Sequence, residues 1–154
     1  KLYRHERASP LALNLKTLAT QIEEYAAARA ARLSSGQVSS IVRGLTGSSH
    51  TLHTNSLLAL AAVLVAKDCQ RLKLASDQEW KDIVWGFSMQ GFENSLFWSK
   101  VAAEAAGHVQ KWEANRAASV LKNMANAGCV HAPFMDAAFK HLSANAAQLT
   151  PLSI

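Results

Sequence analysis

Histidine and cysteine are the side chains of this 154-residue chain best suited to binding a metal, and there are six and two of them. His50 and His53 are three residues apart, but no Cys, Asp or Glu lies in the segment around them. Cys129 and His131 are two residues apart, and no second ligand pair stands at a useful spacing. Because a structural zinc site needs about four ligands, the sequence predicts no metal site.

Catalysis would need reactive side chains that converge, and no such pattern is visible. Glu23 and Glu24 are adjacent, so on a helix they point about 100° apart and do not form a pair. His108 and His141 are expected on polar helix faces. The sequence contains no G-x-S-x-G, Walker-type or H-E-x-x-H motif. We therefore expect a protein that is not an enzyme and needs no cofactor.

Positive charge is a further feature, with 16 Lys and Arg against 11 Asp and Glu, a net charge of +5 and a pI near 9.5. This balance suits an anionic partner such as RNA, but it also fits plain solubility. Cys69 and Cys129 lie far apart and form no disulfide framework, which favours a reducing compartment.

Helices are the elements expected to position these residues. Glycine and proline number only 7 and 3, and no stretch shows sustained period-two alternation of β-branched residues, so we predict no strands. Caps, prolines and glycines mark helix ends. These marks are Ser9-Pro10, Ser76 with Glu79, Gly91, Gly128 and Pro133. The expected helices are 10–32, 35–46, 54–72, 76–90, 93–111, 114–127 and 132–147.

Residues 57–66 form a run of ten apolar residues that Lys67 and Asp68 end at once. A membrane span needs about 20 apolar residues. We therefore expect no membrane span and interpret 57–66 as part of a fully buried central helix.

Three segments, 40–46, 82–88 and 119–125, repeat one pattern of polar, apolar and small residues. Their equivalent positions Ile41, Ile83 and Val120 are 42 and 37 residues apart. A helical-repeat period near 40 is typical of α-solenoids.

Each repeat carries an apolar stripe that one hairpin cannot bury alone. The stripes are Val38, Ile41, Val42 and Leu45; Trp80, Ile83, Val84 and Phe87; and Ala117, Val120, Leu121 and Met124. The sequence thus predicts an all-α fold: a short, right-handed α-solenoid of about three stacked helix hairpins with about seven helices. The helical-repeat domain is expected over 10–147, with an arm at 1–9 and a tail at 148–154, and its ends are expected to dock on partner proteins.

The helix Ile83-Val84-Trp85-Gly86-Phe87-Ser88 resembles the second helix of organellar helical repeats, as do the segments beginning at Ile41 and Val120. These are the octotricopeptide, heptatricopeptide and FAST-kinase-like repeats of RAP-type proteins, here without a RAP domain. The resemblance implies a location in the mitochondrial matrix or in a plastid. It also implies RNA binding, either alone or within an organellar ribosome, or an architectural role there.

Arg43, Trp85 and Lys122 occupy equivalent repeat positions and could form a ladder of two cations and one stacking ring for RNA. Equally, these positions could face solvent or, for Trp85, the core. A second candidate set could bind phosphates or simply complement helix ends. It consists of Lys67, Arg71, Lys73, Lys111 and Arg116.

Two functions follow from these patterns. The first is a non-enzymatic RNA-binding or structural subunit of an organellar ribonucleoprotein, above all a mitochondrial ribosome, with ribosomal or other organellar RNA and protein subunits as partners. The alternative is a protein–protein scaffold subunit of another organellar complex with little RNA contact.

Overall fold

A computed structural model describes residues 10–150, with side chains from Leu13 onward, and within this range the chain is helical without strands. The helices are α1 (Pro10–Arg29), α2 (Ser35–Gly47), α3 (Thr54–Lys73), α4 (Asp77–Met89), α5 (Ser95–His108), α6 (Ala114–Asn126) and α7 (Ala132–Ala144). Short 3-10 turns follow three of them: η1 (Ala30–Arg32), η2 (Val109–Lys111) and η3 (Ala146–Gln148). The predicted all-α fold with seven helices is confirmed.

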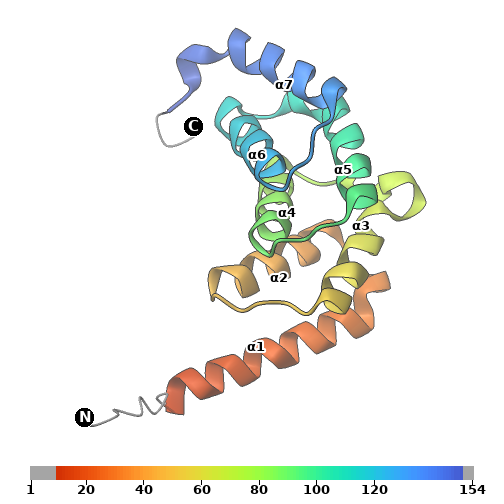
Figure 1. Cartoon of the computed structure of the whole chain (residues 1–154), viewed down its shortest axis with the longest axis vertical. Coiled ribbons are helices and arrows are strands. Elements are labelled where there is room, and N and C mark those ends of the chain that lie inside the picture. Colours follow the sequence, from red (N-terminus) through yellow and green to blue (C-terminus); the bar gives the residue numbers. More distant parts are fainter. Residues whose placement is uncertain (1–9, 151–154) are drawn as a thin grey trace.

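The helices stack in two rows (Figure 1). In the row that we call the odd row, α1, α3, α5 and α7 pack side by side in that order. In the even row, α4 lies between α2 and α6 and packs against both. This arrangement is a short helical-repeat solenoid, in which each helix mainly contacts its neighbours in the stack.

The predicted end signals are found where the structure describes them. Ser76 and Glu79 form a reciprocal capping box at the start of α4. Gly91 and Gly128 follow the ends of α4 and α6 with φ of +63° and +72°, a conformation that glycine adopts without strain. Pro133 lies in the first turn of α7. The Ser9 cap, the 1–9 arm and the last four residues of the tail lie outside the described residues.

The repeated apolar stripes form the core of the stack. Val38, Val42 and Leu45 of α2 are buried, as are the equivalent residues of α4 and α6 except for the half-buried Leu121. Ile41, at the open end of the even row, is also half-buried. Burial of these stripes is therefore shared between neighbouring helices, as the repeat pattern predicts.

The interpretation of residues 57–66 as part of a fully buried helix is wrong in two respects. The α3 helix lies in the odd row with one face toward solvent, so Leu58 is 41% exposed. The helical backbone is also interrupted after Val65, because Ala66 is extended and Lys67, Asp68 and Cys69 have φ of 48°, 54° and 57°.

Arg71 stabilises this interruption from within α3. Its guanidinium donates to the carbonyl of Val63 at 3.2 Å, and also to Leu33 at 2.7 Å and Ala31 at 2.8 Å. One side chain thus satisfies a carbonyl just before the break and two at the end of the α1–η1 segment, where helix carbonyls lack partners. The sequence pattern could not show the break, because apolar periodicity does not report backbone dihedral angles.

A matched pair of glycines tests the packing of the even row. A Cβ at Gly86 would lie 2.3 Å from Cγ1 of Val42, whereas a Cβ at Gly44 would meet nothing within 4 Å. We expect Gly86→Ala to destabilise the fold by about 1–2 kcal/mol, because overpacking outweighs the gain in helix propensity. Gly44→Ala should stabilise it by up to about 1 kcal/mol. Urea unfolding of both variants measures this difference, and shifts of the same sign and size would contradict it.

Candidate functional site

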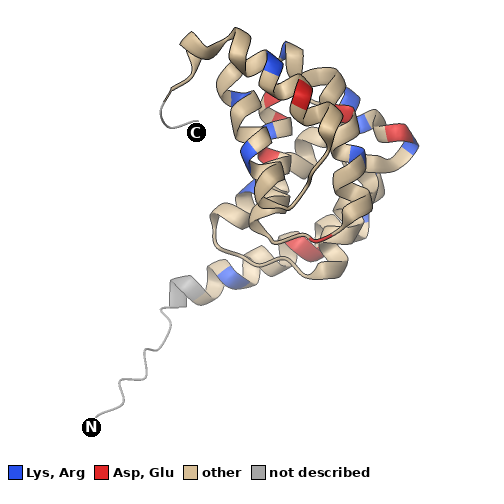
Figure 2. Ribbon diagram, turned by 45° about the horizontal axis from the view of Figure 1, so that its top comes forward, with Lys and Arg blue, Asp and Glu red and all other residues tan. Residues whose placement is uncertain are grey.

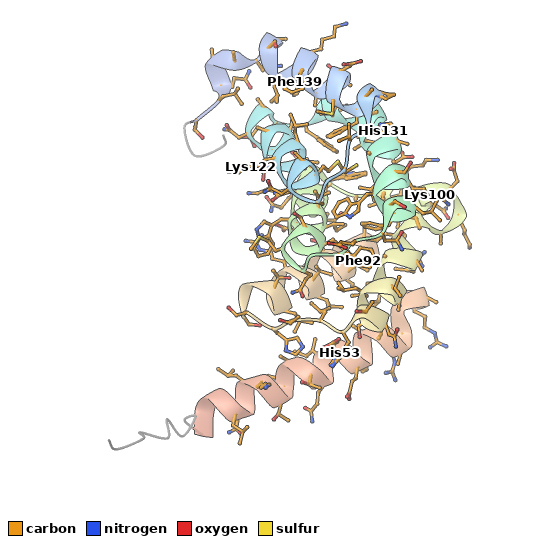
Figure 3. The ribbon with its side chains drawn as sticks, in the orientation of Figure 1. His53, Phe92, Lys100, Lys122, His131 and Phe139 are labelled. Carbon is orange, nitrogen blue, oxygen red and sulfur yellow. The ribbon has the colours of Figure 1, made fainter. Side chains whose placement is uncertain are left out.

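The three predicted ladder residues lie on one face of the even row. Arg43, Trp85 and Lys122 each sit about 150° around the helix from the centre of the buried stripe. Arg43 and Lys122 are exposed, and Trp85 is half-buried. Lys122 lies at the edge of α6 away from α5 (Figure 3). Lys and Arg residues recur along the edge of the stack where α2, α4 and α6 lie (Figure 2). We call this surface the outer face of the even row.

Ion pairs within the even row engage two of the candidate cations. Nη1 of Arg43 lies 3.1 and 2.9 Å from the two carboxylate oxygens of Asp82, which also accepts a hydrogen bond from Gln78. Nη1 of Arg116 pairs with one carboxylate oxygen of Asp77 and so links α6 to α4. These contacts tie α4 to both of its neighbours in the row. They also neutralise part of the positive charge that RNA would need.

The remaining candidate cations lie away from the outer face of the even row. Arg71 is engaged by three backbone carbonyls, as described above. Lys73 contacts Asp68 at 2.7 Å. Lys67 is exposed within the interruption of α3, and Lys111 is exposed at the end of η2. The candidate set from the sequence is therefore split between two parts of the surface.

A buried carboxylate that the sequence reasoning missed joins α1 to the loop before α3. Glu23 is only 1% exposed. Its Oε2 lies 2.7 Å from Nε2 of His50, and its Oε1 accepts the backbone N–H of His53 at 2.6 Å and lies 3.0 Å from Nδ1 of the same residue. His53 lies between the loop and α1 (Figure 3). The available signal was the spacing of Ala19, Glu23 and Ala26, which places an acid on the buried face of a helix.

Opposing influences set the pKa of Glu23. Burial is the largest and raises the pKa, because it disfavours the charged form. Hydrogen bonds from His50, Ser56 and His53 to the carboxylate together outweigh burial and lower the pKa from 4.5 to about 2. Glu23 is therefore ionised at neutral pH and holds α1 in place. No group of three or more His, Cys, Asp or Glu within the described residues could hold a metal ion.

The prediction that His141 lies on a polar helix face is wrong. His141 is 7% exposed, and its Nε2 lies 2.9 Å from the carbonyl oxygen of Trp112. His108 is half-buried and lies 3.0 Å from a carboxylate oxygen of Glu104. Both histidines therefore support the packing around η2. Sequence spacing could not show this, because the contacts of His141 come from a segment 29 residues away.

Among the described residues, nothing covers the N-terminal end of the stack, which is apolar. On α1, Leu15, Leu18, Ile22 and Tyr25 are between 41% and 59% exposed. Their spacing places them on one side of the helix. Leu15, Leu18 and Ile22 border a groove of about 1250 Å³ between α1 and α2, which we call the N-terminal groove. Its wall on α2 includes Ile41, Gly44 and Leu45.

The C-terminal end differs because the chain folds back on it. The η3 turn packs against α6, and the backbone N–H of Thr150 donates to Oδ1 of Asn115 at 3.0 Å. Ala114 and Ala118 of α6 are buried. The two ends of the even row are therefore not equivalent, and α2 presents the open one.

Within the described residues, no helix is long and apolar enough to cross a membrane. Comparison with protein-family models and with curated protein sequences finds no match to this chain.

We predict that removing the charge of Glu23 weakens the fold in a pH-dependent way. The pKa of Glu23 is lower in the folded chain than its usual 4.5, so its contribution to stability is full above pH 4.5 and is lost as the pH falls toward 2. A shift of this size corresponds to about 3 kcal/mol. Glu23→Gln should therefore lower the free energy of unfolding at pH 7 by up to about 3 kcal/mol.

Urea unfolding between pH 7 and pH 3 measures this effect. The exposed neighbour Glu24 supplies the control, and Glu24→Gln should change stability by no more than about 0.5 kcal/mol. Equal effects of the two substitutions at pH 7 would show that Glu23 has no special role.

Proposed function

We propose that this chain is a non-enzymatic scaffold that binds other proteins through the open N-terminal end of its helix stack. The observation that carries the proposal is the exposed apolar side of α1. Leu15, Leu18 and Ile22 lie there at the N-terminal groove, and Tyr25 is exposed on the same side of the helix. Large contiguous apolar patches on a soluble surface mark interaction sites, because burying them removes apolar area from water.

The contacts that the basic residues make within the chain also favour protein partners over RNA. Arg43 and Arg116 pair with carboxylates of α4, and Arg71 donates to backbone carbonyls. Residues that stabilise the chain in this way lose those contacts if they turn toward phosphates. The scaffold alternative left open by the sequence therefore becomes the leading proposal.

We propose an organellar complex, above all one of the mitochondrial matrix, as the setting of this scaffold. Support comes from the resemblance of residues 83–88 to organellar helical repeats. In such a complex the stack would act as a rigid spacer, because each helix packs against its neighbours in the stack.

Sedimentation of the tagged chain from mitochondrial extracts tests the proposal. We expect the chain in a high-mass fraction that survives RNase treatment. The double substitution Leu18→Asp and Ile22→Asp should return it to the position of the free protein, because two charges would enter the docking surface. Leu74→Asp is the matched control, since Leu74 is exposed at the end of α3 and does not line the groove. Release by RNase, or no release by the double substitution, would contradict the proposal.

RNA binding by the outer face of the even row is the second candidate function. The observation that favours it is the equivalent position of Arg43, Trp85 and Lys122 in the repeats, on the neighbouring helices α2, α4 and α6 of the even row. Two cations can contact phosphates and one indole can stack on a base. The proposed ligand is single-stranded organellar RNA, including ribosomal RNA.

A salt titration of RNA binding tests this second candidate. Two phosphate contacts to a single strand predict a slope of log affinity against log salt of about −1.4. Replacing Arg43 and Lys122 with Ala should bring the slope close to zero, and Trp85→Ala should weaken binding with little change in slope. A filter-binding assay measures all three, and an unchanged slope in the double variant would exclude this face as the RNA site.

A further inference from the structure

We infer that the N-terminal groove binds an acidic amphipathic helix of a partner protein, which takes the position of one more helix in the even row. This inference rests on the proposed scaffold function and adds the chemistry of the partner. The groove lies along the side of α2 that faces away from α4. A helix placed there would pack against both α1 and α2.

The repeat itself shows how such a helix would pack. Gly44 of α2 and Gly86 of α4 occupy equivalent positions, three residues after Ile41 and Ile83. At Gly86 the missing side chain makes room for Val42 of α2, whose Cγ1 would lie 2.3 Å from a Cβ placed there. At Gly44 the same space is open, with nothing within 4 Å. The docking helix would place a branched aliphatic side chain on Gly44, as Val42 lies on Gly86.

The α1 wall of the groove explains why the helix must be amphipathic. The buried side of α1 includes Ala19 and Ala26, and its apolar surface continues through Ile22 to the exposed Leu15 and Leu18. The apolar surface of α1 is therefore wider than the part of it that the other helices bury. On the α2 wall, Ile41 is half-buried although its equivalent Ile83 is fully buried.

The charged and polar residues of the groove favour an acidic docking helix. The groove is lined by Lys16, by His50 and His53, and by hydroxyl groups such as that of Ser40, with no Asp or Glu among the lining residues. An acidic side chain at the edge of the docking helix would meet Lys16 and these polar groups. The carboxylate of Glu23 contacts His50 and His53, but it is buried and does not line the groove. A basic helix would meet Lys16 unfavourably.

A second copy of this chain fits the groove less well than a separate partner. Head-to-tail stacking would require α6 of one copy on α2 of the next, but η3 and Thr150 already pack against α6. Each copy also carries a net charge of +5, which disfavours self-association. The occupant is therefore assigned to a partner protein.

The chain supplies its own probe for the experiment. Residues 76–90, which contain α4, form an amphipathic helix with three acids and one lysine. This helix packs against α6 in the even row, as the docking helix would pack against α2. A fluorescein-labelled synthetic peptide of residues 76–90 is titrated with the full chain, and binding is followed by fluorescence anisotropy. A peptide with Val84→Asp is the negative probe.

The decisive variant fills the groove without disturbing the fold. A Cβ at Gly44 meets nothing within 4 Å, so Gly44→Leu extends its side chain from there into the groove. A Cβ at Gly107 of α5, away from the groove, likewise meets nothing within 4 Å, so Gly107→Leu is the matched control. Thermal unfolding should show both variants folded, because a leucine favours a helix over glycine. We expect saturable binding of the wild-type peptide, weakened at least about tenfold by Gly44→Leu and unchanged by Gly107→Leu.

Three results would overturn the inference. They are absence of saturable binding, equal binding by the Gly44→Leu variant, and a dimer in sedimentation equilibrium that Gly44→Leu dissociates.

The sedimentation test of the scaffold is independent of these results. If Leu18→Asp with Ile22→Asp releases the chain from its complex while the peptide does not bind, the scaffold stands and the groove assignment fails. If the peptide binds but no RNase-resistant complex exists, the scaffold fails and the groove stands.

Discussion

Shared burial of one apolar stripe per helix is the constraint on which the even row depends. No hairpin of this chain encloses its own stripe, so α2, α4 and α6 are stable only side by side. The approach of α2 to α4 is closest at Gly86, where Val42 occupies the space that a side chain would take. The same constraint leaves an unfilled position at each end of the row. Within the part of the chain that the structure describes, η3 covers one end and the other is open at Gly44.

Polar contacts set the alignment of the stack rather than drive its formation. Arg43 with Asp82 and Arg116 with Asp77 bridge neighbouring helices, and partly exposed pairs of this kind contribute no more than about 1 kcal/mol each. The buried Glu23 is different, because its carboxylate would be unfavourable without the hydrogen bonds from His50, His53 and Ser56. Its removal affects the attachment of α1, which carries the docking surface.

One half of α1 is held against the stack, and the other half exposes the apolar docking residues. Its C-terminal half is held by the contacts of Glu23 and by Arg71, which binds the carbonyls of Ala31 and Leu33. Its N-terminal half extends beyond α2 and α3 (Figure 1) and exposes Leu15 and Leu18. A rigidly held apolar helix binds a partner with little loss of conformational entropy, which suits a scaffold.

The sequence alone determined the all-α fold, the helix ends and the repeat, because caps, glycines and apolar periodicity act through neighbours a few residues apart. It also placed Arg43, Trp85 and Lys122 on one face, since equal repeat positions share a direction around the helix. Only the tertiary structure decided which charges are paired and that Glu23 meets His50 and His53. It also decided that α3 is interrupted and that the N-terminal end is the open one. These features depend on contacts between segments distant in sequence, and local patterns carry no information about such distances.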